Sequence, residues 1–432
     1  MIIFSIFAPL TSIPLYNLYI MRKAYLIWMA GFLALFAGCS QEEILIPDPP
    51  QDRVPTRVSI QDALKNADKM FENIYGIESR ANTRKVKSVQ YHGSLSTRSG
   101  EETPLYYVVN YENEGGFAVL GADTRLDPVY AISNEGHLDM NDTTFNEGLS
   151  IFFDGLSSIG IANPDSLYVR PDPDPYIKDP QPDIPPTQPT FVGHKVLPLL
   201  TTAVSQWSQY YPFNAFCPMI AYQYALVGCT NVAAGQIMAF YEHPTVYSIY
   251  QFDWYSMKEW IPQGYIPENG VPRLLSELGK EGNFNTSYGI DASGSNTKQY
   301  YKRTFRNFGY KTPGDFKSFS ETSVDSYLKK NKPVFLRGTH YTTLSEGGHA
   351  WVCDGVYYDY WKGEDIFGEM GFYGQGYFFH MVWGWGGSSN GYYKYGVTSL
   401  SGYSQYSSTN DNVSSSVPVK NIEYCGDFTP DK

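Results

Sequence analysis

Cys229 stands at a position in the sequence where a thiol can become a nucleophile. It lies in the stretch VGCTNVAAGQIMAFYEHP, in which residues 229–241 contain no proline and the run VAAGQIMAFY after Asn231 consists mostly of good helix formers. A cysteine at the start of a helix meets unpaired backbone N–H groups and the positive end of the helix dipole, which favour the thiolate. The same N–H groups can donate hydrogen bonds to a developing oxyanion. From this stretch alone, Cys229 is either a nucleophile or a small buried residue at the head of a core helix.

A nucleophilic cysteine needs a proton partner, and His349 is the histidine in the most suggestive setting. It stands in EGGHAWVCDG, after two glycines that leave space above the imidazole and within a strand-like apolar run. The separation of 120 residues, 349 minus 229, is no obstacle, because the two side chains need only meet in space. The alternative is a histidine in the core of a strand.

The elements that must position these residues fall on either side of a proline-rich stretch. Apolar residues at helical spacing over 56–76 predict an amphipathic helix, and PLYYVVNYENEGGFAVLGAD at 104–123 predicts a β-hairpin. Proline is then so dense from Arg170 to Pro189 that neither a helix nor a sheet ladder can form. We interpret that stretch as an extended linker, with an ordered arm packed on a neighbour as the alternative.

The segment after the linker shows helical patterns first and strand patterns later. Helical spacing covers 230–241, 270–282 and 323–331, whereas apolar and aromatic runs punctuated by glycines follow from residue 333. This order predicts an α+β domain in which the two kinds of element are segregated. Cys229 then falls in the helical part and His349 in the β part.

The N-terminus carries the pattern of a secretory signal. The run that begins MRKAYLIWMAGFLALFAGCS has a charged start and a short apolar middle, so Met21 is a better start than Met1. The ending LFAGC resembles a bacterial lipoprotein box, which makes Cys39 the expected lipid attachment site; a plain signal peptide is the alternative. We expect export across the inner membrane and lipid anchoring at the cell envelope, at the outer membrane or the cell surface, with no membrane contact beyond the anchor.

Composition bounds the remaining functions. The chain has 432 residues, which predicts two domains, and 16% aromatic residues, which is typical of a tyrosine-rich secreted protein. The net charge of −12 argues against nucleic-acid binding. The cysteines form neither a CxxC pair nor a zinc-ligand spacing, so no metal and no organic cofactor is predicted.

Six segments together resemble the streptopain family of papain-like cysteine peptidases. They are WSQYYPFN (207–214), GCTNVAAGQIMAFYEHP (228–244), SYGIDASGS (287–295), KPVFLRG (332–338), GGHAWVCDG (347–355) and WGWGGSSNGYY (383–393). Residues 55–165 are similar, more weakly, to that family's inhibitory propeptide. The resemblance implies an α+β papain-like fold, whose helical part carries the cysteine and whose antiparallel β part carries the histidine, after a smaller α+β propeptide domain.

The resemblance also implies roles for individual residues. Cys229 would be the nucleophile and His349 its proton partner, with Gln209 as the side-chain donor of the oxyanion hole. Trp383 and Trp385 would shield the imidazole from water. Small residues in and beside the matching segments, which are Ser293, Gly294 and Gly348, would line the substrate pocket. The family commonly has asparagine immediately before the first of these tryptophans, but Val382 stands here, so His349 must be oriented by a backbone carbonyl or by another side chain.

The sequence thus predicts a secreted, lipid-anchored zymogen of a cysteine endopeptidase that hydrolyses proteins or peptides through a thioester. The predicted organisation is a signal peptide over 1–39, a tether over 40–54, an inhibitory propeptide over 55–168, a linker over 169–190 and the peptidase over 191–432. Removal of the propeptide, the enzyme's own inhibitor, would activate it. One alternative is a weak or inactive binding lipoprotein that kept the fold, and another is acyl transfer to an amine.

Overall fold

The computed structural model describes residues 57–76, 84–96, 102–124, 126–138, 140, 146–161, 190–262, 264–341, 346–364, 370–394 and 422–431. The predicted signal peptide, the lipidation site Cys39, the tether and residues 169–189 of the predicted linker lie outside these residues. The chain from Thr56 onward forms one compact unit. Among the described residues, no helix combines the length and the apolar character needed to cross a membrane.

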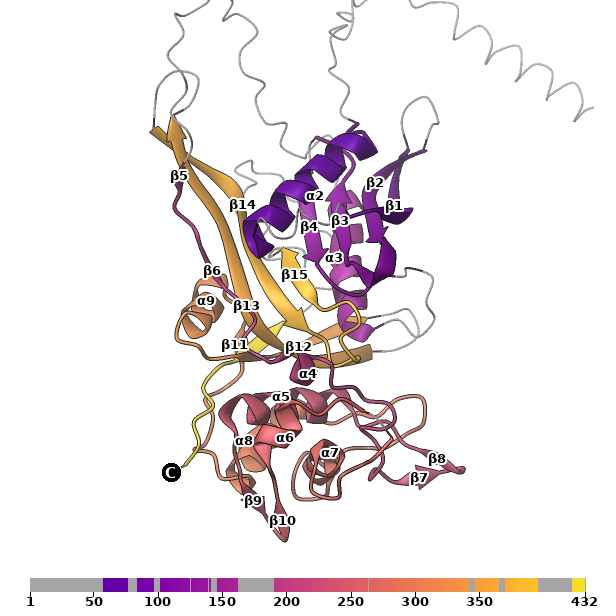
Figure 1. The fold of residues 1–432 in the computed structure, drawn as a ribbon, viewed down its shortest axis with the longest axis vertical. Helices are drawn as coiled ribbons and strands as arrows, with labels where there is room; N and C mark the ends of the chain where they lie inside the picture. The colour runs from indigo at the N-terminus through magenta and orange to yellow at the C-terminus, as the bar shows by residue number, and fades with distance from the viewer. Residues whose placement is uncertain are drawn as a thin grey trace, which may run out of the picture. The chain divides into compact units, whose positions relative to one another are not determined.

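The N-terminal region is a helix packed on a four-stranded antiparallel meander (Figure 1). The predicted helix is confirmed as α2 (Ile60–Tyr75), which begins where the Ser59 hydroxyl accepts a hydrogen bond from the Asp62 N–H. The apolar side chains that give the helix its periodicity are buried against β3 and β4: Ala63, Ala67, Met70, Phe71 and Ile74. The strands are β1 (Val86–Ser96), β2 (Glu102–Tyr111), β3 (Phe117–Gly121) and β4 (Val129–Ser133), and the predicted hairpin is confirmed as β2 and β3.

The region contains a further helix, α3 (Glu147–Ile161), which the sequence analysis did not predict. Asn146 precedes it and accepts hydrogen bonds through Oδ1 from the backbone N–H groups of Gly148 and Leu149. The helix packs against two strands of the C-terminal half of the chain, β12 (Val334–Tyr341) and β13 (Glu346–Glu364). It therefore links the N-terminal region to the strand that carries His349.

The helical part after the linker surrounds one central helix. That helix is α5 (Cys229–Tyr241), in which every residue from Cys229 to Ala239 is buried. Gly235 allows close neighbours, because a Cβ there would lie 2.7 Å from Leu275 and 3.2 Å from Trp207. Around α5 lie α4 (Thr202–Ser205), α6 (Trp254–Lys258), α7 (Val271–Gly279) and α8 (Thr297–Asn307), with the small hairpins β7–β8 (Met219–Ile220, Gln223–Tyr224) and β9–β10 (Val246–Tyr247, Tyr250–Gln251). Helix α9 (Glu321–Leu328) packs instead on β12 and β13.

The β part is antiparallel and continues the N-terminal meander into one sheet. Its main strands are β12 (Val334–Tyr341), β13 (Glu346–Glu364), β14 (Met370–Val382), β15 (Gly391–Lys394) and β16 (Glu423–Cys425), with β11 (Lys317–Ser318) at the edge. β15 pairs with β4, so that Tyr393 faces Ala131 and the sheet has 12 strands among the described residues. The short strands β5 (Thr190–Phe191) and β6 (His194–Val196) pair with β13. Thr190, the last residue of the predicted linker, lies in β5, where its backbone pairs with Lys362.

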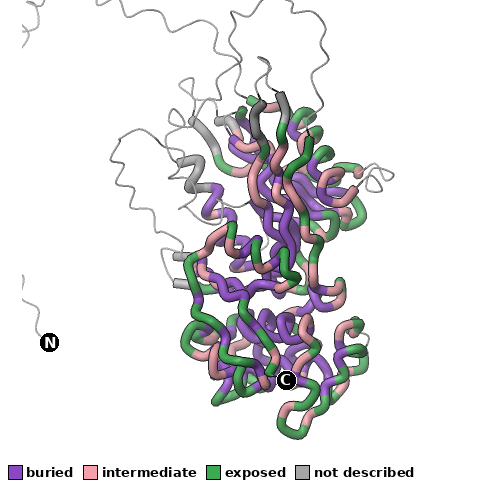
Figure 2. The backbone as a smooth tube through the Cα atoms, turned by 90° about the vertical axis from the view of Figure 1, so that its left-hand side faces the viewer, coloured by how far each residue is buried: buried purple, intermediate pink, exposed green. Residues whose placement is uncertain are grey.

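Side chains alternate along β13, so that helices α5 and α3 pack on opposite faces of the sheet. Ala350 and Val352 pack in the core that contains α5, whereas Trp351 and Cys353 pack in the core that contains α3. Buried residues concentrate along these strands and in the helical part next to them, and exposed residues lie on the outer loops (Figure 2). The predicted α+β class, with Cys229 in the helical part and His349 in the antiparallel part, is confirmed.

Candidate active site

Cys229 is the first residue of α5, as its sequence context predicts. The preceding Gly228 has φ 93°, a left-handed conformation that favours glycine and turns the chain into the helix. One residue earlier, the Val227 N–H donates to the Gln209 carbonyl over 3.0 Å. This bond holds Gln209, which is buried, beside the segment that enters α5, as an oxyanion donor would have to be.

His349 lies in β13 opposite Gly338 of β12, with its imidazole on the face of the sheet that α3 covers. Its Nε2 is 2.8 Å from the carbonyl oxygen of Trp383. Because a carbonyl can only accept, Nε2 carries a hydrogen and donates. Nδ1 then remains as the second ring nitrogen, and it faces Cys229 and Glu147.

Glu147, the first residue of α3, is the side chain at this site that the sequence analysis missed. Its Oε2 lies 3.4 Å from His349 Nδ1, an ion-pair distance at which the angles do not make a hydrogen bond. Donor atoms of Glu147, Cys229 and His349 all lie within 4.8 Å of one another. The signal available in the sequence was Asn146 as a helix cap before the largely apolar run EGLSIFFDGL, which indicates a helix start but not its location.

The electrostatics of His349 favour the protonated imidazole. Burial lowers the pKa of His349, but its interactions with the Cys229 and Glu147 side chains outweigh burial and raise the pKa to about 10. The two side chains that raise this pKa are the predicted nucleophile Cys229 and the first residue of α3, Glu147.

Three tryptophan rings surround the imidazole. Trp385 lies nearly parallel to it at 6.3 Å between ring centroids, and Trp383 is tilted at 6.5 Å. Both predicted tryptophans are therefore at the site. Trp351, two residues after His349 on the same face of β13, stacks at 5.9 Å and was not predicted, although its period-2 spacing was a readable signal.

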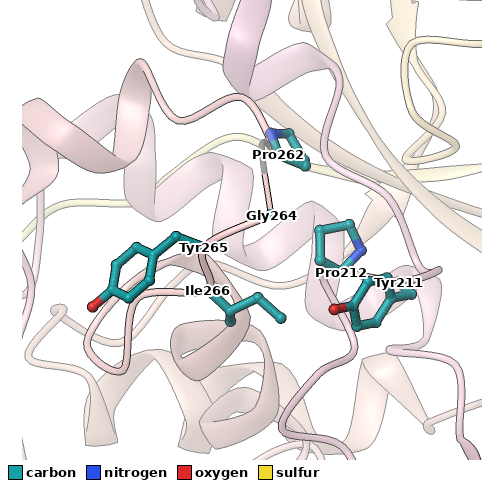
Figure 3. A pocket seen from close by; sticks show the side chains of 6 residues that line it. All are labelled: Tyr211, Pro212, Pro262, Gly264, Tyr265 and Ile266. Atoms are coloured by element: carbon teal, nitrogen blue, oxygen red, sulfur yellow. The ribbon is translucent and has the colours of Figure 1, made fainter.

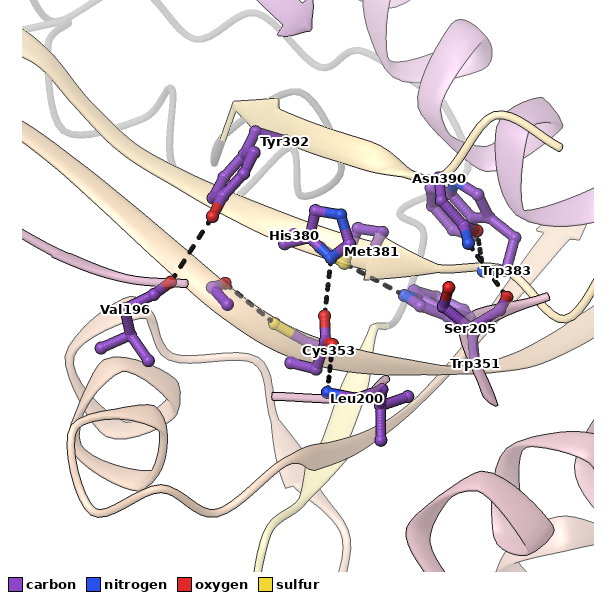
Figure 4. A network of polar contacts seen from close by, with 12 residues as sticks. Val196, Leu200, Ser205, Trp351, Cys353, His380, Met381, Trp383, Asn390 and Tyr392 are labelled. Atoms are coloured by element: carbon purple, nitrogen blue, oxygen red, sulfur yellow. Dashed lines mark hydrogen bonds and ion pairs between the residues drawn. The ribbon is translucent and has the colours of Figure 1, made fainter. Parts of the chain in front are cut away.

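The structure shows which group orients the His349 imidazole, since Val382 has no side-chain hydrogen-bonding group. Val382 is fully buried in the core around α5, and the imidazole is oriented by the next residue's carbonyl, that of Trp383. Asn390 fixes that residue, because its Oδ1 accepts from the Trp383 N–H at 3.0 Å and its Nδ2 donates to the Ser205 carbonyl at 3.1 Å (Figure 4). The backbone carbonyl of Trp383, whose N–H is held by Asn390, thus orients the ring.

Asp354 faces away from His349, as its position five residues along the strand predicts. Its Oδ1 lies 2.6 Å from His380 Nδ1, and its Oδ2 accepts from the Leu200 N–H at 3.0 Å (Figure 4). Asp354 and His380 are both buried. Asp354 therefore ties β13 to β14 and to the segment that leads into the helical part.

The residues predicted to line the substrate pocket are only partly gathered around Cys229. The Ser293 carbonyl would be 3.4 Å from a Cβ at Gly228, so this segment lies beside the start of α5. The Ser293 hydroxyl is engaged with the backbone of Gly289, and Gly294 has open space where a side chain would be. Gly348 is exposed beside His349. Their role in substrate binding stays a prediction.

A pocket of about 200 Å³ is lined by Tyr211, Pro212, Pro262, Gly264, Tyr265 and Ile266 (Figure 3). Tyr211 and Pro212 follow Gln209 by two and three residues in the chain. The four free cysteines among the described residues are Cys217, Cys229, Cys353 and Cys425, so Cys217 and Cys425 do not pair.

Comparison with known proteins supports the class of protein that the site indicates. A cysteine and a histidine meet at a helix start and a strand, under a helix of an N-terminal domain, and this defines a cysteine endopeptidase with an inhibitory propeptide. Residues 207–393 match the Peptidase C10 family and residues 55–158 match the Spi protease inhibitor. The predicted resemblance to the streptopain family, with an inhibitory propeptide, is therefore confirmed over these two stretches.

The relatives of this chain share about a quarter of its residues or fewer over the matched stretches. The chain is 27% identical over 330 residues to the thiol protease/hemagglutinin PrtT of Porphyromonas gingivalis, which covers 67% of this chain but only 34% of that protein. The chain thus spans about a third of the length of PrtT. It is 23% identical over 360 residues to streptopain of Streptococcus pyogenes serotype M1, covering 72% of this chain and 77% of streptopain.

Two solved structures are similar to this chain. A prointerpain A fragment of Prevotella intermedia, in a cysteine-to-alanine mutant, has a TM-score of 0.48 at 18% identity and covers 78% of this chain and 97% of that chain. Active wild-type interpain A of the same organism has a TM-score of 0.37 at 19% identity and covers 54% and 94%.

Proposed function

We propose that Cys229 and His349 carry out acyl transfer in a secreted, lipid-anchored zymogen of this peptidase. The Cys229 thiolate attacks the peptide carbonyl, and the Cys229 N–H and the Gln209 side chain stabilise the tetrahedral oxyanion. His349 protonates the leaving amine, and water then hydrolyses the thioester. The observation that carries the proposal is the meeting of Cys229 and His349, 120 residues apart, at the N-terminus of a buried helix.

The propeptide would inhibit by direct occupancy of the site. The first turn of α3 lies on the dyad so closely that a Cβ at Gly148 would be 2.2 Å from the Trp383 ring and 3.0 Å from the His349 ring. A substrate chain cannot pass through that space while α3 remains there. Activation then requires the propeptide to leave, which breaks the β4–β15 pairing as well as the α3 contact.

Cleavage between residues 185 and 200 would release the propeptide. A cut before Thr190 leaves β5 and β6 paired with β13 in the mature enzyme, whereas a cut after Val196 detaches both strands. The pairing favours cleavage on the N-terminal side of Thr190, since it retains the sheet contacts. N-terminal sequencing of the mature enzyme identifies the cut.

Lipid anchoring and envelope location rest on the LFAGC motif that ends at Cys39. Replacement of Cys39 by alanine is expected to abolish incorporation of labelled palmitate and to move the protein out of the membrane fraction. Palmitate incorporation that persists in Cys39→Ala contradicts the anchor.

The decisive test of the catalytic proposal is Cys229→Ala in the zymogen. Self-processing, casein cleavage and labelling by an epoxysuccinyl peptide should all disappear, while Cys217→Ala, a matched change at another buried thiol, should retain them. Unchanged casein cleavage by Cys229→Ala would contradict the proposal that Cys229 is the nucleophile. Loss of labelling in the wild type would instead favour an inactive binding protein with this fold.

A further inference from the structure

A cluster of three different metal-binding side chains spans the boundary between propeptide and peptidase. It consists of Glu147, Cys229 and His349, whose donor atoms lie within 4.8 Å of one another; we call it the Glu147 cluster. Glu147 belongs to the propeptide helix α3, and the other two belong to the peptidase. We infer that the zymogen binds a zinc ion at the Glu147 cluster, and that this ion holds the propeptide on the active site.

The donor set suits zinc. A thiolate, an imidazole nitrogen and a carboxylate oxygen are the ligand types that Zn²⁺ takes in proteins, with three protein ligands and a water as a common tetrahedral arrangement. With bonds of about 2.1 Å to nitrogen and oxygen, a tetrahedral ion separates these two atoms by about 3.4 Å. His349 Nδ1 and Glu147 Oε2 are 3.4 Å apart. The sulfur completes the site by a shift of about 1.2 Å at most, since tetrahedral geometry requires about 3.6 Å between sulfur and nitrogen and the atoms lie within 4.8 Å.

The orientation of His349 is the second, independent indication of a ligand. Its side chain is 0% exposed, and Nδ1 has no hydrogen-bond partner among the described residues, although it points into the cluster. Nε2 donates to the Trp383 carbonyl, which fixes the ring and directs the lone pair of a neutral imidazole at Nδ1. Histidines that bind metals usually donate their other N–H in this way. An ion at the cluster would bond to this nitrogen, which makes no hydrogen bond to the described residues.

The cluster is reached from the side of Glu147. That side chain is 41% exposed, whereas Cys229 and His349 are buried, so an ion and its remaining water can enter past the carboxylate. Gly148 keeps the first turn of α3 against Trp383 and therefore keeps Glu147 over the dyad. The carboxylate, unlike the other two ligands, leaves with the propeptide.

Binding displaces one proton and involves no redox step. In the thiolate–imidazolium state, Zn²⁺ bonds to the Cys229 sulfur, to the Glu147 carboxylate and to His349 Nδ1, whose proton goes to solvent. The ion thereby occupies the thiolate lone pair that would attack a substrate and the nitrogen that would protonate its leaving group. A zinc-bound zymogen is consequently unable to process itself.

Because the site is complete only when the propeptide is docked, zinc shifts the docking equilibrium. An ion that binds the docked state alone lowers the undocked fraction by about 100-fold at a free concentration 100 times its Kd. This regulatory consequence rests on the proposed function of Cys229 and His349. The binding itself rests only on the geometry of the cluster.

The test measures zinc binding to the full-chain zymogen and to its own mature product by competition with a chromophoric chelator. We expect one ion per zymogen, sulfur ligation in zinc X-ray absorption, and release of about one proton in weakly buffered solution. Affinity should fall at least 10-fold in Glu147→Gln and in the mature enzyme, and should fall similarly in Cys229→Ser. Glu112→Gln, an exposed carboxylate of the propeptide away from the cluster, is the matched control and should bind as the wild type does.

Equal zinc affinity of wild type and Glu147→Gln overturns the inference, as does ligation without sulfur. Glutamine is close in size to glutamate, and circular dichroism together with thermal unfolding verifies that the variant is folded. Saturating zinc should also slow self-processing at least 10-fold in wild type and in Glu112→Gln, with recovery on chelation. If zinc does not bind while casein cleavage still depends on Cys229, the zinc site fails and the catalytic proposal stands.

Discussion

Gly148 offers the sharpest way to separate inhibition by the propeptide from catalysis by the peptidase. It is the second residue of α3, and a Cβ at this position would lie 2.2 Å and 2.5 Å from two carbons of the Trp383 ring. Those distances are far below van der Waals contact, and Trp383 is fully buried, so the ring has little room to retreat. In Gly148→Ala, α3 must therefore move away from the active site.

The size of the effect follows from the cost of overpacking a filled core, about 1–3 kcal/mol. That cost falls on the docked state alone, because the alanine has free space once α3 leaves the peptidase. Alanine also favours a helix over glycine by about 1 kcal/mol, but this gain stabilises α3 in both states and cancels. The undocked fraction should rise roughly 5- to 150-fold.

The assay is the rate of self-processing of the purified zymogen, followed on gels and by labelling with an epoxysuccinyl peptide. Gly148→Ala should process and label faster than wild type, and its mature product should cleave casein at the wild-type rate. Ser150→Ala, a partly exposed position on the same helix, controls for the change in helix propensity and should process as the wild type does. A folded Gly148→Ala zymogen that processes at the wild-type rate refutes the idea that α3 inhibits by contact with Trp383 and His349.

Three further substitutions test how the site is held together. Asn390→Ala should lower the melting temperature and reduce kcat more than it changes KM, because it leaves the buried Trp383 N–H unpaired, at a cost of about 1–3 kcal/mol, and frees the carbonyl that orients His349. Val382→Asn should lower the midpoint of urea unfolding without raising kcat, because the amide would enter an apolar core, again at about 1–3 kcal/mol. Gln209→Ala should lower kcat by about 10²–10³ in a peptide hydrolysis assay if its side chain donates to the oxyanion.

The sequence was a good guide to elements whose pattern is local. Helix α2 has its apolar residues at regular spacing behind a serine cap, and the β2–β3 hairpin has a glycine pair at its tip, so both could be read directly. Helix α3 was missed because its sequence is apolar on most sides, and a helix buried on several faces loses the periodicity that marks an amphipathic one. Its burial comes from β12 and β13, nearly 200 residues later in the chain.

The pairing that joins the N-terminal meander to the β part, like the burial of α3, depends on residues far apart in the sequence. β15 has only four residues, all buried, and β4 has five, so neither strand specifies its partner by length or by alternation. Their pairing joins what composition alone describes as two domains. Such an edge-to-edge contact suits an inhibitor that must later leave, because the backbone hydrogen bonds it gives up can be replaced by water.

Among the residues of the site, those in distinctive sequence segments could be predicted, whereas the one brought in by packing could not. Cys229, His349 and the two tryptophans were found because each lies in a short distinctive segment. Glu147 was not found, because its importance comes from the place where α3 docks rather than from its neighbours in the chain.

The orientation of His349 combines both kinds of information. Val382 showed that the usual amide was missing, and Asn390 lay in the same WGWGGSSNGYY segment, but nothing in the sequence connected them. A glycine-rich turn over residues 384–387, with left-handed backbone at Gly384, Gly386 and Gly387, brings Asn390 back to the Trp383 peptide. The Asn390 amide therefore acts on His349 indirectly: it binds the Trp383 N–H, and the Trp383 carbonyl holds the imidazole. A valine next to the first tryptophan is then compatible with an active enzyme, provided that Asn390 is retained, which is why Asn390→Ala should reduce kcat while Val382→Asn should gain nothing.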